Sequence, residues 1–350
     1  MPYNNSVPTV VVKVYDKTGL YLDQLQVRSP RSYLLNDIGQ CVFTVSVDDP
    51  RCTENILRIG NLIKVVSDNG APDWDGVIDL PIKHNVGSKT ITAYSAEYMA
   101  KLQIVGNFAP AAAKPGAILT ALLSDQMKNI SAGNVDTING TAFSYTKTRT
   151  SVYDIIKNIV GTTGGRFRMY YVNNNLNSNI TIKWDFQFSF IVYNKNVLLD
   201  ESVVELVETG GVEYQSPFYN KLRAYGNAQN TTTATDIVLI DQASIDLYGL
   251  REKAYQVESQ DTATITQLAT NYWNMIKQPQ KVIQLATINW NSNLWSLITI
   301  GLQVRVKLSW VRWYNNYTGL DSTFVVTGLS VDEMAGVMVF TVQQYASEVQ

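Results

Sequence analysis

The residues best able to do acid–base chemistry are few in this sequence. His84 is its single histidine, so a Ser-His-Asp mechanism would have to use that side chain. A serine nucleophile on a sharp strand-to-helix turn is typically marked by Gly-x-Ser-x-Gly. That motif does not occur in the sequence. We therefore interpret His84 as a surface residue in the turn of a hairpin, and we expect no catalytic residues.

Metal and phosphate chemistry lack their usual motifs as well. Zinc sites need several histidine or cysteine ligands, and the chain has one histidine and two cysteines, with no Cys-x-x-Cys. A calcium loop that began at Asp73 would need a glutamate at the position that His84 occupies. Residues 161–165 (GTTGG) lack the Gly-Lys-Ser/Thr ending of a phosphate loop and are typical of a helix C-terminus. We expect no metal and no cofactor.

Carboxylates give one further possibility. Asp332 and Glu333 stand side by side in a turn-rich segment, and we interpret them as a turn pair. Glycosidases use two carboxylates that need not be close in the chain, so this chemistry stays open on the sequence alone. No motif supports it.

Aromatic residues are concentrated near the C-terminus, where three functions are open. Stacking on carbohydrate is one, and packing in a β-barrel core is another. The third is a protein interface, where Trp, Tyr and Arg are enriched. Two of the tryptophans and an arginine lie in the loop after residues 302–307, and this position favours the interface interpretation. The candidate interface residues are Trp310, Arg312, Trp313, Tyr314 and Tyr317, with Trp290 and Trp295 nearby in the sequence.

Composition narrows the class of protein. The 350 residues carry a net charge of −2 and only 17% charged residues, so they offer no basic surface for tight nucleic-acid binding. Two cysteines, Cys41 and Cys52, do not make a disulfide framework, and free thiols are favoured. The start of the sequence does not resemble a secretory signal. No apolar run approaches the roughly 20 residues of a membrane-spanning helix.

The elements that would position these residues occur twice. Near the start, an Ile59-Gly60 pair opens an alternating strand, and a polar loop and a hairpin over residues 77–94 follow. Near the end, Ile300-Gly301 opens another strand, followed by an aromatic loop and a hairpin over residues 323–345. Strict alternation indicates half-buried strands. An internal repeat of this order predicts two related small β-barrels.

The segment between the two copies has a different pattern. Apolar residues at helical spacing follow Pro115, and Ser151 is the expected N-cap of a second helix over residues 152–160. Strands are expected at residues 166–172, 180–184 and 186–192. The fold class is therefore mainly β with an α+β insert. The predicted domains are a first β-barrel (1–104), an α+β insert (105–208) and a second β-barrel (209–350) that contains a helix at about 261–277, capped by Asp261.

Nearly the whole chain resembles tail hub proteins, which stand at the distal end of phage tail tubes. The segments that carry the resemblance are FTVSVDD (43–49), LRIGNLIKV (57–65), DWDGVI (73–78), ITAYSAEYMAKL (91–102), SIDLYGLRE (244–252), TIGLQVRV (299–306) and FVVTGLSVD (324–332). The resemblance implies a homotrimer with two related barrels in each subunit. Six barrels would then form a pseudo-hexameric ring that adapts a sixfold tube to a threefold tip.

This resemblance implies a structural virion protein of the phage tail tip or baseplate. Its expected partners are further copies of itself, the tail tube or distal tail ring, the tape measure protein, and tip or fibre proteins. DNA would pass through the ring without tight binding. Many such proteins carry a C-terminal peptidase or lysin, whereas this sequence stops at Gln350, so we expect no enzyme. The alternative functions are carbohydrate binding by the C-terminal tryptophans and, without a supporting motif, an uncharacterised hydrolase.

Overall fold

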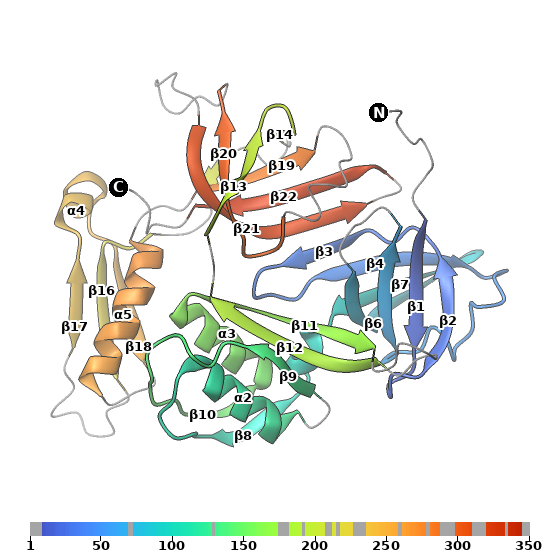
Figure 1. Cartoon of the computed structure of the whole chain (residues 1–350), viewed down its shortest axis with the longest axis horizontal. Helices are drawn as coiled ribbons and strands as arrows, with labels where there is room; N and C mark the ends of the chain where they lie inside the picture. The colour runs from blue at the N-terminus through green and yellow to red at the C-terminus, as the bar shows by residue number, and fades with distance from the viewer. Residues whose placement is uncertain are drawn as a thin grey trace.

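The protein is mainly β with an α+β insert, as predicted, and its elements form four groups (Figure 1). The computed structural model describes residues 9–344 except 69–72, 128–129, 174–181, 191–192, 207–211, 215–217, 227–235, 258–260, 278–280, 288–297, 310–319 and 333–334. No described helix is long and apolar enough to cross a bilayer.

The first β-unit comprises the seven N-terminal strands. Its apolar residues alternate along each strand, as in β4, where Cys41, Phe43 and Val45 are buried and the residues between them face outward. The strands are β1 (Val10–Tyr15), β2 (Tyr21–Gln26), β3 (Arg31–Leu34), β4 (Gln40–Ser46), β5 (Leu62–Ser67), β6 (Trp74–Asn85) and β7 (Ser88–Ser95). They lie in the order β3-β4-β7-β6-β5-β1-β2 around a core of their own.

The second β-unit is built from the C-terminal strands and three strands that precede them, of which β14 and β15 are short. Its members are β13 (Tyr193–Asp200), β14 (Val204–Leu206), β15 (Val212–Tyr214), β19 (Lys281–Thr287), β20 (Gln303–Leu308), β21 (Leu320–Asp332) and β22 (Val337–Gln343). It too has its own apolar core. Strand β21 pairs with β3, so the two β-units share one 14-stranded sheet.

The predicted repeat is present as a repeated pattern of backbone hydrogen bonds. The Gly60 N–H donates to the carbonyl of Ile78 (2.9 Å), and the Gly301 N–H donates to that of Val326 (2.8 Å). Both glycines have positive φ, +90° and +80°, a conformation that costs L-residues with a Cβ energy. The strands that follow each glycine pair in the same way. Strand β5 pairs with β6, which forms a hairpin with β7, and β20 pairs with β21, which forms a hairpin with β22.

The insert forms three helices, of which α1 is short, and two small sheets beneath the shared sheet (Figure 1). Helix α3 begins at the predicted cap, where the Ser151 side chain accepts from the Asp154 N–H, and ends at Gly164, which has φ +73°. Its apolar face packs on α2 and on β11. The elements are α1 (Tyr98–Lys101), β8 (Ile104–Phe108), α2 (Pro115–Gln126), β9 (Ile130–Val135), β10 (Lys147–Ser151), α3 (Val152–Thr163), β11 (Gly165–Asn173) and β12 (Ile182–Phe190).

A second α/β layer lies beside the insert, where the sequence predicted mainly a helix within the second barrel. It contains β16 (Lys221–Gly226), β17 (Ile237–Ile240), α4 (Gln242–Tyr248), β18 (Glu252–Val257) and α5 (Thr262–Ile276). Helix α5 is capped by Asp261 as predicted, covers one face of this three-stranded sheet and packs on α3. The layer shares its core with the insert, because the apolar stripe of α5 faces both.

Two further details differ from the sequence-based prediction. Residues 182–190 form the single strand β12 rather than two strands, because β12 pairs with β11 along its whole length. Strands β13 and β14 lie within residues 105–208, yet they pair with β20 and β19 of the second β-unit.

Candidate assembly junction between the repeated units

The junction between the two β-units is a short antiparallel ladder. Residues Gly328–Val331 of β21 face Leu34–Arg31 of β3, with Ser330 opposite Ser32. Just before this ladder, the Leu35 N–H donates to the Thr327 carbonyl (2.8 Å). At its far end the Arg28 guanidinium forms an ion pair with Asp332. Main-chain bonds thus hold the two units in one orientation.

Buried side chains support β3 from the first β-unit. The Trp74 indole, which is 1% exposed, donates through Nε1 to the Ser32 carbonyl (2.9 Å). Arg31 is also buried, at 2% exposure, and its Nε donates to the Tyr33 hydroxyl (3.0 Å). The indole lies against Gly76, where an added Cβ would be 2.4 Å from the ring. The close packing of the indole on the backbone therefore requires a glycine at position 76.

The edge of β11 is bound by side chains rather than by another strand. Its N–H groups at Phe167, Met169 and Tyr171 donate to Asn36 Oδ1 (2.9 Å), Glu97 Oε1 (2.9 Å) and Asp75 Oδ2 (3.2 Å), respectively. The three donors alternate along the strand, so they point to the same side. All three acceptors belong to the first β-unit or to the segment that directly follows it. This edge therefore docks the insert on the first β-unit.

Two of these acceptors are buried acids. Burial raises the pKa of the Glu97 carboxyl above its ordinary value of 4.5, although the Ser95 hydroxyl and the Met169 N–H oppose the shift. Burial also raises the pKa of Asp75, against the opposing effect of the Lys64 ammonium 3.2 Å away. The pKa of Lys64 is lowered by burial but raised overall by Asp75 and Asp73. Lys64 therefore stays protonated and partly neutralises Asp75.

Arg166 of β11 links the insert to the second β-unit. Its Nε donates to Ser189 Oγ (3.0 Å) and its Nη1 to the Ile300 carbonyl (2.9 Å). Burial lowers the pKa of its guanidinium. Its Cδ would be 2.7 Å from a Cβ added at Gly301, so this second glycine of the repeat also makes room for the insert.

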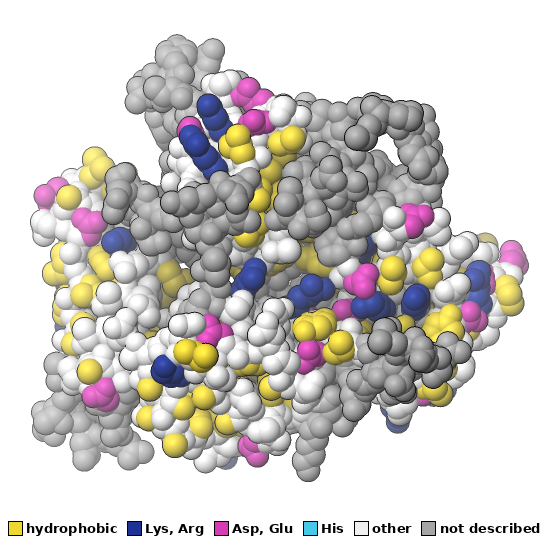
Figure 2. Space-filling model, viewed as in Figure 1, with side chains coloured by type: hydrophobic (Ala, Val, Ile, Leu, Met, Phe, Trp, Pro, Cys, Tyr) yellow, Lys and Arg dark blue, Asp and Glu magenta, His cyan; other side chains and the backbone are white. Residues whose placement is uncertain are grey.

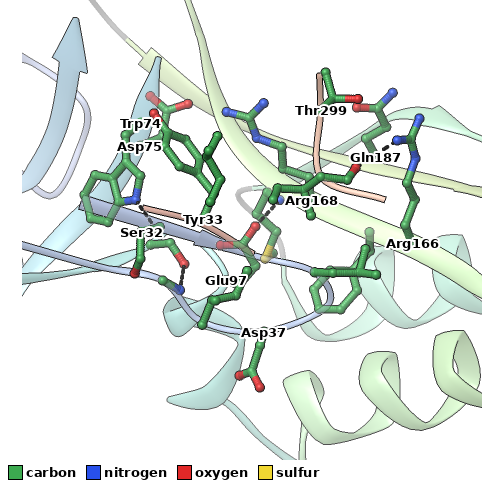
Figure 3. Close-up of a pocket in the computed structure, with 18 of the residues that line it drawn as sticks. Ser32, Tyr33, Asp37, Trp74, Asp75, Glu97, Arg166, Arg168, Gln187 and Thr299 are labelled. Carbon is green, nitrogen blue, oxygen red and sulfur yellow. Dashed lines mark hydrogen bonds between the residues drawn. The ribbon is translucent and has the colours of Figure 1, made fainter. Parts of the chain in front are cut away.

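A cavity of about 300 Å³ lies where the two β-units and the insert meet. Figure 3 shows its polar lining: Trp74, Asp75 and Glu97 come from the first β-unit and the turn after it, Arg166 and Arg168 from the insert, and Thr299 from the second β-unit. The polar groups bond chiefly to main chain of neighbouring elements. Among the described residues, no group of three or more His, Cys, Asp or Glu is arranged to hold a metal ion. These hydrogen bonds join the first β-unit, the second β-unit and the insert to one another.

The structure places the other predicted residues as follows. His84 is an exposed residue within β6, opposite Lys89, rather than in the hairpin turn. Lys64 bridges Asp73 and Asp75 at 3.0 and 3.2 Å. Neither Cys41 nor Cys52 forms a disulfide. The candidate interface residues Trp310, Arg312, Trp313, Tyr314 and Tyr317, like Trp290 and Trp295, lie outside the described residues.

Sequence reasoning missed Asn36 and Glu97 and interpreted Asp75 only as part of a turn. Glu97 had a usable signal, because it is the single charged residue in segment 90–100. A charge is rarely buried without partners, so such an acid indicates hydrogen-bond donors from elsewhere in the fold. Asn36 has φ +54°, a conformation that asparagine tolerates better than most residues, but its long-range partners leave no local pattern.

Comparison with solved structures gives the fold a known context. No family model and no curated protein sequence matches the chain. A tail protein from Neisseria meningitidis MC58 matches over 96% of this chain and 97% of its own, with a TM-score of 0.62 and 11% identity. The chain has the fold of phage tail proteins. The prophage MuSo2 43 kDa tail protein from Shewanella oneidensis (TM-score 0.60, 14% identity, 95% and 98% covered) agrees with this assignment.

A prophage tail protein from Listeria monocytogenes EGD-e gives a third match. Its TM-score is 0.57 at 12% identity, and 97% of this chain and 96% of that chain are covered. These matches extend over nearly the full length of both partners, so the repeated units and the insert are all part of the shared fold. The resemblance to tail hub proteins seen in the sequence segments is thus supported at the level of the fold.

Proposed function

We propose that the protein is a structural hub of a phage tail tip or baseplate, in which three copies form a ring at the distal end of the tail tube. The observation that carries this proposal is the repeat itself. Two equivalent β-units are joined within one chain by strand pairing between β21 and β3. That contact is heterologous, because it uses a different surface on each unit, and heterologous contacts close into rings when the rotation permits.

A duplicated unit suits a position between parts of different symmetry. Three chains with two units each would present six similar β-units to a sixfold tube, while the rest of each chain keeps threefold symmetry. The insert and the α/β layer lie together on one side of the shared sheet (Figure 1). Their position supports an assignment in which the β-units face the tube and the insert extends toward the tip.

The insert would also give the ring its rigidity. It bonds to the first β-unit through β11 and to the second through Arg166 and the Ile300 carbonyl. A subunit held at both ends can keep the angle between its β-units constant when the tip is under load.

The proposed partners are further copies of this chain, the tail tube or distal tail ring above, the tape measure protein, and tip or fibre proteins below. DNA would cross the ring transiently. On the face shown in Figure 2, the coloured Lys and Arg side chains are interspersed with Asp and Glu, and neutral side chains surround both. Such a mixed surface, with the net charge of −2, supports passage rather than retention of a polyanion. The protein would act in the virion without catalytic activity.

Mass measurement tests the proposal. The full-length chain is examined by native mass spectrometry and light scattering, alone and with its cognate tail tube protein. We expect a species of three times the monomer mass and a ring with threefold symmetry in particle images. A stable monomer that does not associate with the tube protein, and whose tryptophan fluorescence is quenched by sugars, would contradict the hub and favour carbohydrate binding.

A further inference from the structure

Strand β21 uses one edge for two successive partners. Residues Leu320–Val325 pair with β20, and residues Gly328–Val331 then pair with β3 along the same edge. The change of partner occurs at Val326, whose N–H donates to Leu302 and whose carbonyl accepts from Gly301. A bulge at this point turns the strand from one unit to the next.

The equivalent strand β6 begins in the same way. Residues 74–77 pair with β5, and Ile78 then bonds to Gly60 and Asn61 in the pattern of Val326. Beyond Ile78 the register also shifts. Among the described residues, however, the edge of β6 that corresponds to the β3-binding edge of β21 has no strand partner after this point. Leu80 is 61% exposed there, and Lys83 and His84 are exposed as well.

The repeat also supplies the strand that should bind this edge. In the first β-unit, Arg31 of β3 faces Cys41 of β4. In the second, Val212 of β15 faces Ile283 of β19, and Cys41 and Ile283 hold equivalent places opposite Ala93 and Val342. Strand β15 is therefore the counterpart of β3. Its described pairing is with β19 alone, whereas β3 lies between β4 and β21.

We propose that the free edge of β6 after its bulge pairs antiparallel with β15 of a second copy of this chain. This inference rests on the proposed ring and specifies its subunit contact. Ser330 of β21 faces Val339, and Lys83 of β6 faces Thr90, at equivalent places in the two hairpins. Lys83 therefore corresponds to Ser330, and Glu213 corresponds to Ser32. In the proposed contact, Lys83 of one chain faces Glu213 of another. A cross-strand pair of two serines is replaced by a pair of opposite charge, which favours this register.

The register has a second consequence for the type of bond. Because Leu35 donates to Thr327 and hydrogen-bonded pairs alternate, Ser330 and Ser32 form a non-hydrogen-bonded pair with closely spaced side chains. Lys83 and Glu213 would occupy the same kind of pair. The Cα atoms of such a pair are about 4.5 Å apart, which lies within the range that a disulfide between cysteines placed there requires.

Edge protection is the competing explanation for this segment. Proline and lysine on an edge strand are a common means to prevent pairing, and β6 carries Pro81 and Lys83. The two explanations differ in what they require of a partner. Protection predicts that the edge stays open in every assembly, whereas the proposed contact predicts a defined register with β15.

Cysteine pairing tests the register directly. The full-length chain carries Cys52→Ser to remove the more accessible native thiol, together with Lys83→Cys and Glu213→Cys. Oxidation should give disulfide-linked dimers and trimers, with the linking peptide identified by mass spectrometry. A matched control replaces Lys83→Cys by Lys101→Cys, at an exposed position on α1. A trimer that forms no 83–213 link, or that links equally in the control, overturns the contact while leaving the ring intact.

Charge reversal gives an independent measurement. Lys83→Glu and Glu213→Lys should each weaken association at each subunit contact by about 2- to 30-fold, and the double reversal should restore it. Lys101→Glu makes the same change of charge away from the edge and should leave association unchanged. Failure of the double reversal to rescue the single variants would overturn the register. A full-length chain that never exceeds monomer mass, even with the tube protein, would instead refute the proposed ring.

Discussion

Glu97 offers the sharpest test of how the insert is held. Its carboxylate accepts from the buried Met169 N–H of β11 at 2.9 Å, and the residue is 7% exposed. Glu97→Gln keeps a carbonyl acceptor but removes the negative charge. Glu97→Ala removes the acceptor and leaves the N–H buried without its partner. The two variants separate the effect of the charge from that of the hydrogen bond.

The expected magnitudes follow from burial. An unsatisfied buried donor costs about 1–3 kcal/mol, so Glu97→Ala should destabilise the docked edge by that amount. This corresponds to about 5- to 150-fold faster amide exchange at β11 if the edge opens locally. Glu97→Gln should exchange close to the wild-type rate near neutral pH, because it loses the charge that is costly to bury while it retains an acceptor.

The pH dependence has a definite sign. The folded pKa of Glu97 lies above its ordinary value of 4.5. The folded state therefore retains a proton that the unfolded state releases, and the contribution of Glu97 to stability falls as the pH rises from about 4.5 toward the folded pKa. Glu97→Gln lacks this titration, so its stability relative to wild type should increase across that range.

Hydrogen exchange followed by mass spectrometry measures these effects on peptides that cover β11. Urea unfolding between pH 4 and pH 8 gives the relative stabilities, and Glu54→Ala, an exposed carboxylate change, is the matched control. The reasoning is refuted if Glu97→Ala exchanges like wild type. It is also refuted if Glu97→Gln loosens β11 as much as alanine does, because the charge rather than the acceptor would then hold the strand.

Three further predictions concern the repeat and its supports. Gly60→Ala should lower the free energy of unfolding in urea by about 1–2 kcal/mol, because Gly60 has a φ of +90°. Gly301→Ala should lower it further, since the new methyl group would also contact Arg166. Equal losses for the two variants would contradict the role of that contact. Ser151→Ala removes the N-cap of α3 and should lower stability by about 1 kcal/mol in thermal melts, whereas Ser151→Thr should retain most of that stability, because its hydroxyl can still accept from the Asp154 N–H and donate to the Asp154 carboxylate. Gly76→Ala would force its methyl group against the buried indole and should cost about 1–3 kcal/mol, with altered tryptophan fluorescence as the independent readout.

Local patterns predicted much of the fold because they depend on nearby residues. The Ser151 and Asp261 caps form where the sequence places them, since a cap needs only an oxygen and an N–H three positions away. The repeat was visible because Gly60 and Gly301 are required by backbone conformation, which the residue type records directly. Alternation then gave the strands that follow each glycine.

The parts that the sequence did not predict depend on distant partners. The pairing of β21 with β3 joins residues about 300 positions apart and uses main-chain groups, which any side chain can accompany. The three-stranded sheet around β16 and the packing of its helix α5 on α3 depend on which buried faces meet, and several combinations share the same local pattern. Asn36 and Glu97 accept from a strand more than 70 residues away, so their spacing in the sequence does not identify β11 as their partner.

The insert and the junction between the β-units together fix the angle between the two β-units. The β21–β3 ladder alone is four residue pairs, and a short ladder can twist. The insert adds bonds on both sides of it, through β11 to the first β-unit and through Arg166 to the second. The angle between the β-units therefore cannot change unless buried hydrogen bonds between the insert and the β-units break. In a closed ring the angle inside each chain fixes the angle left for the contact between chains, so loosening β11 should weaken assembly as well as docking. If the proposed ring is correct, Glu97→Ala, which lies outside the proposed β6–β15 contact, should therefore lower the fraction of trimer, and Glu97→Gln should not.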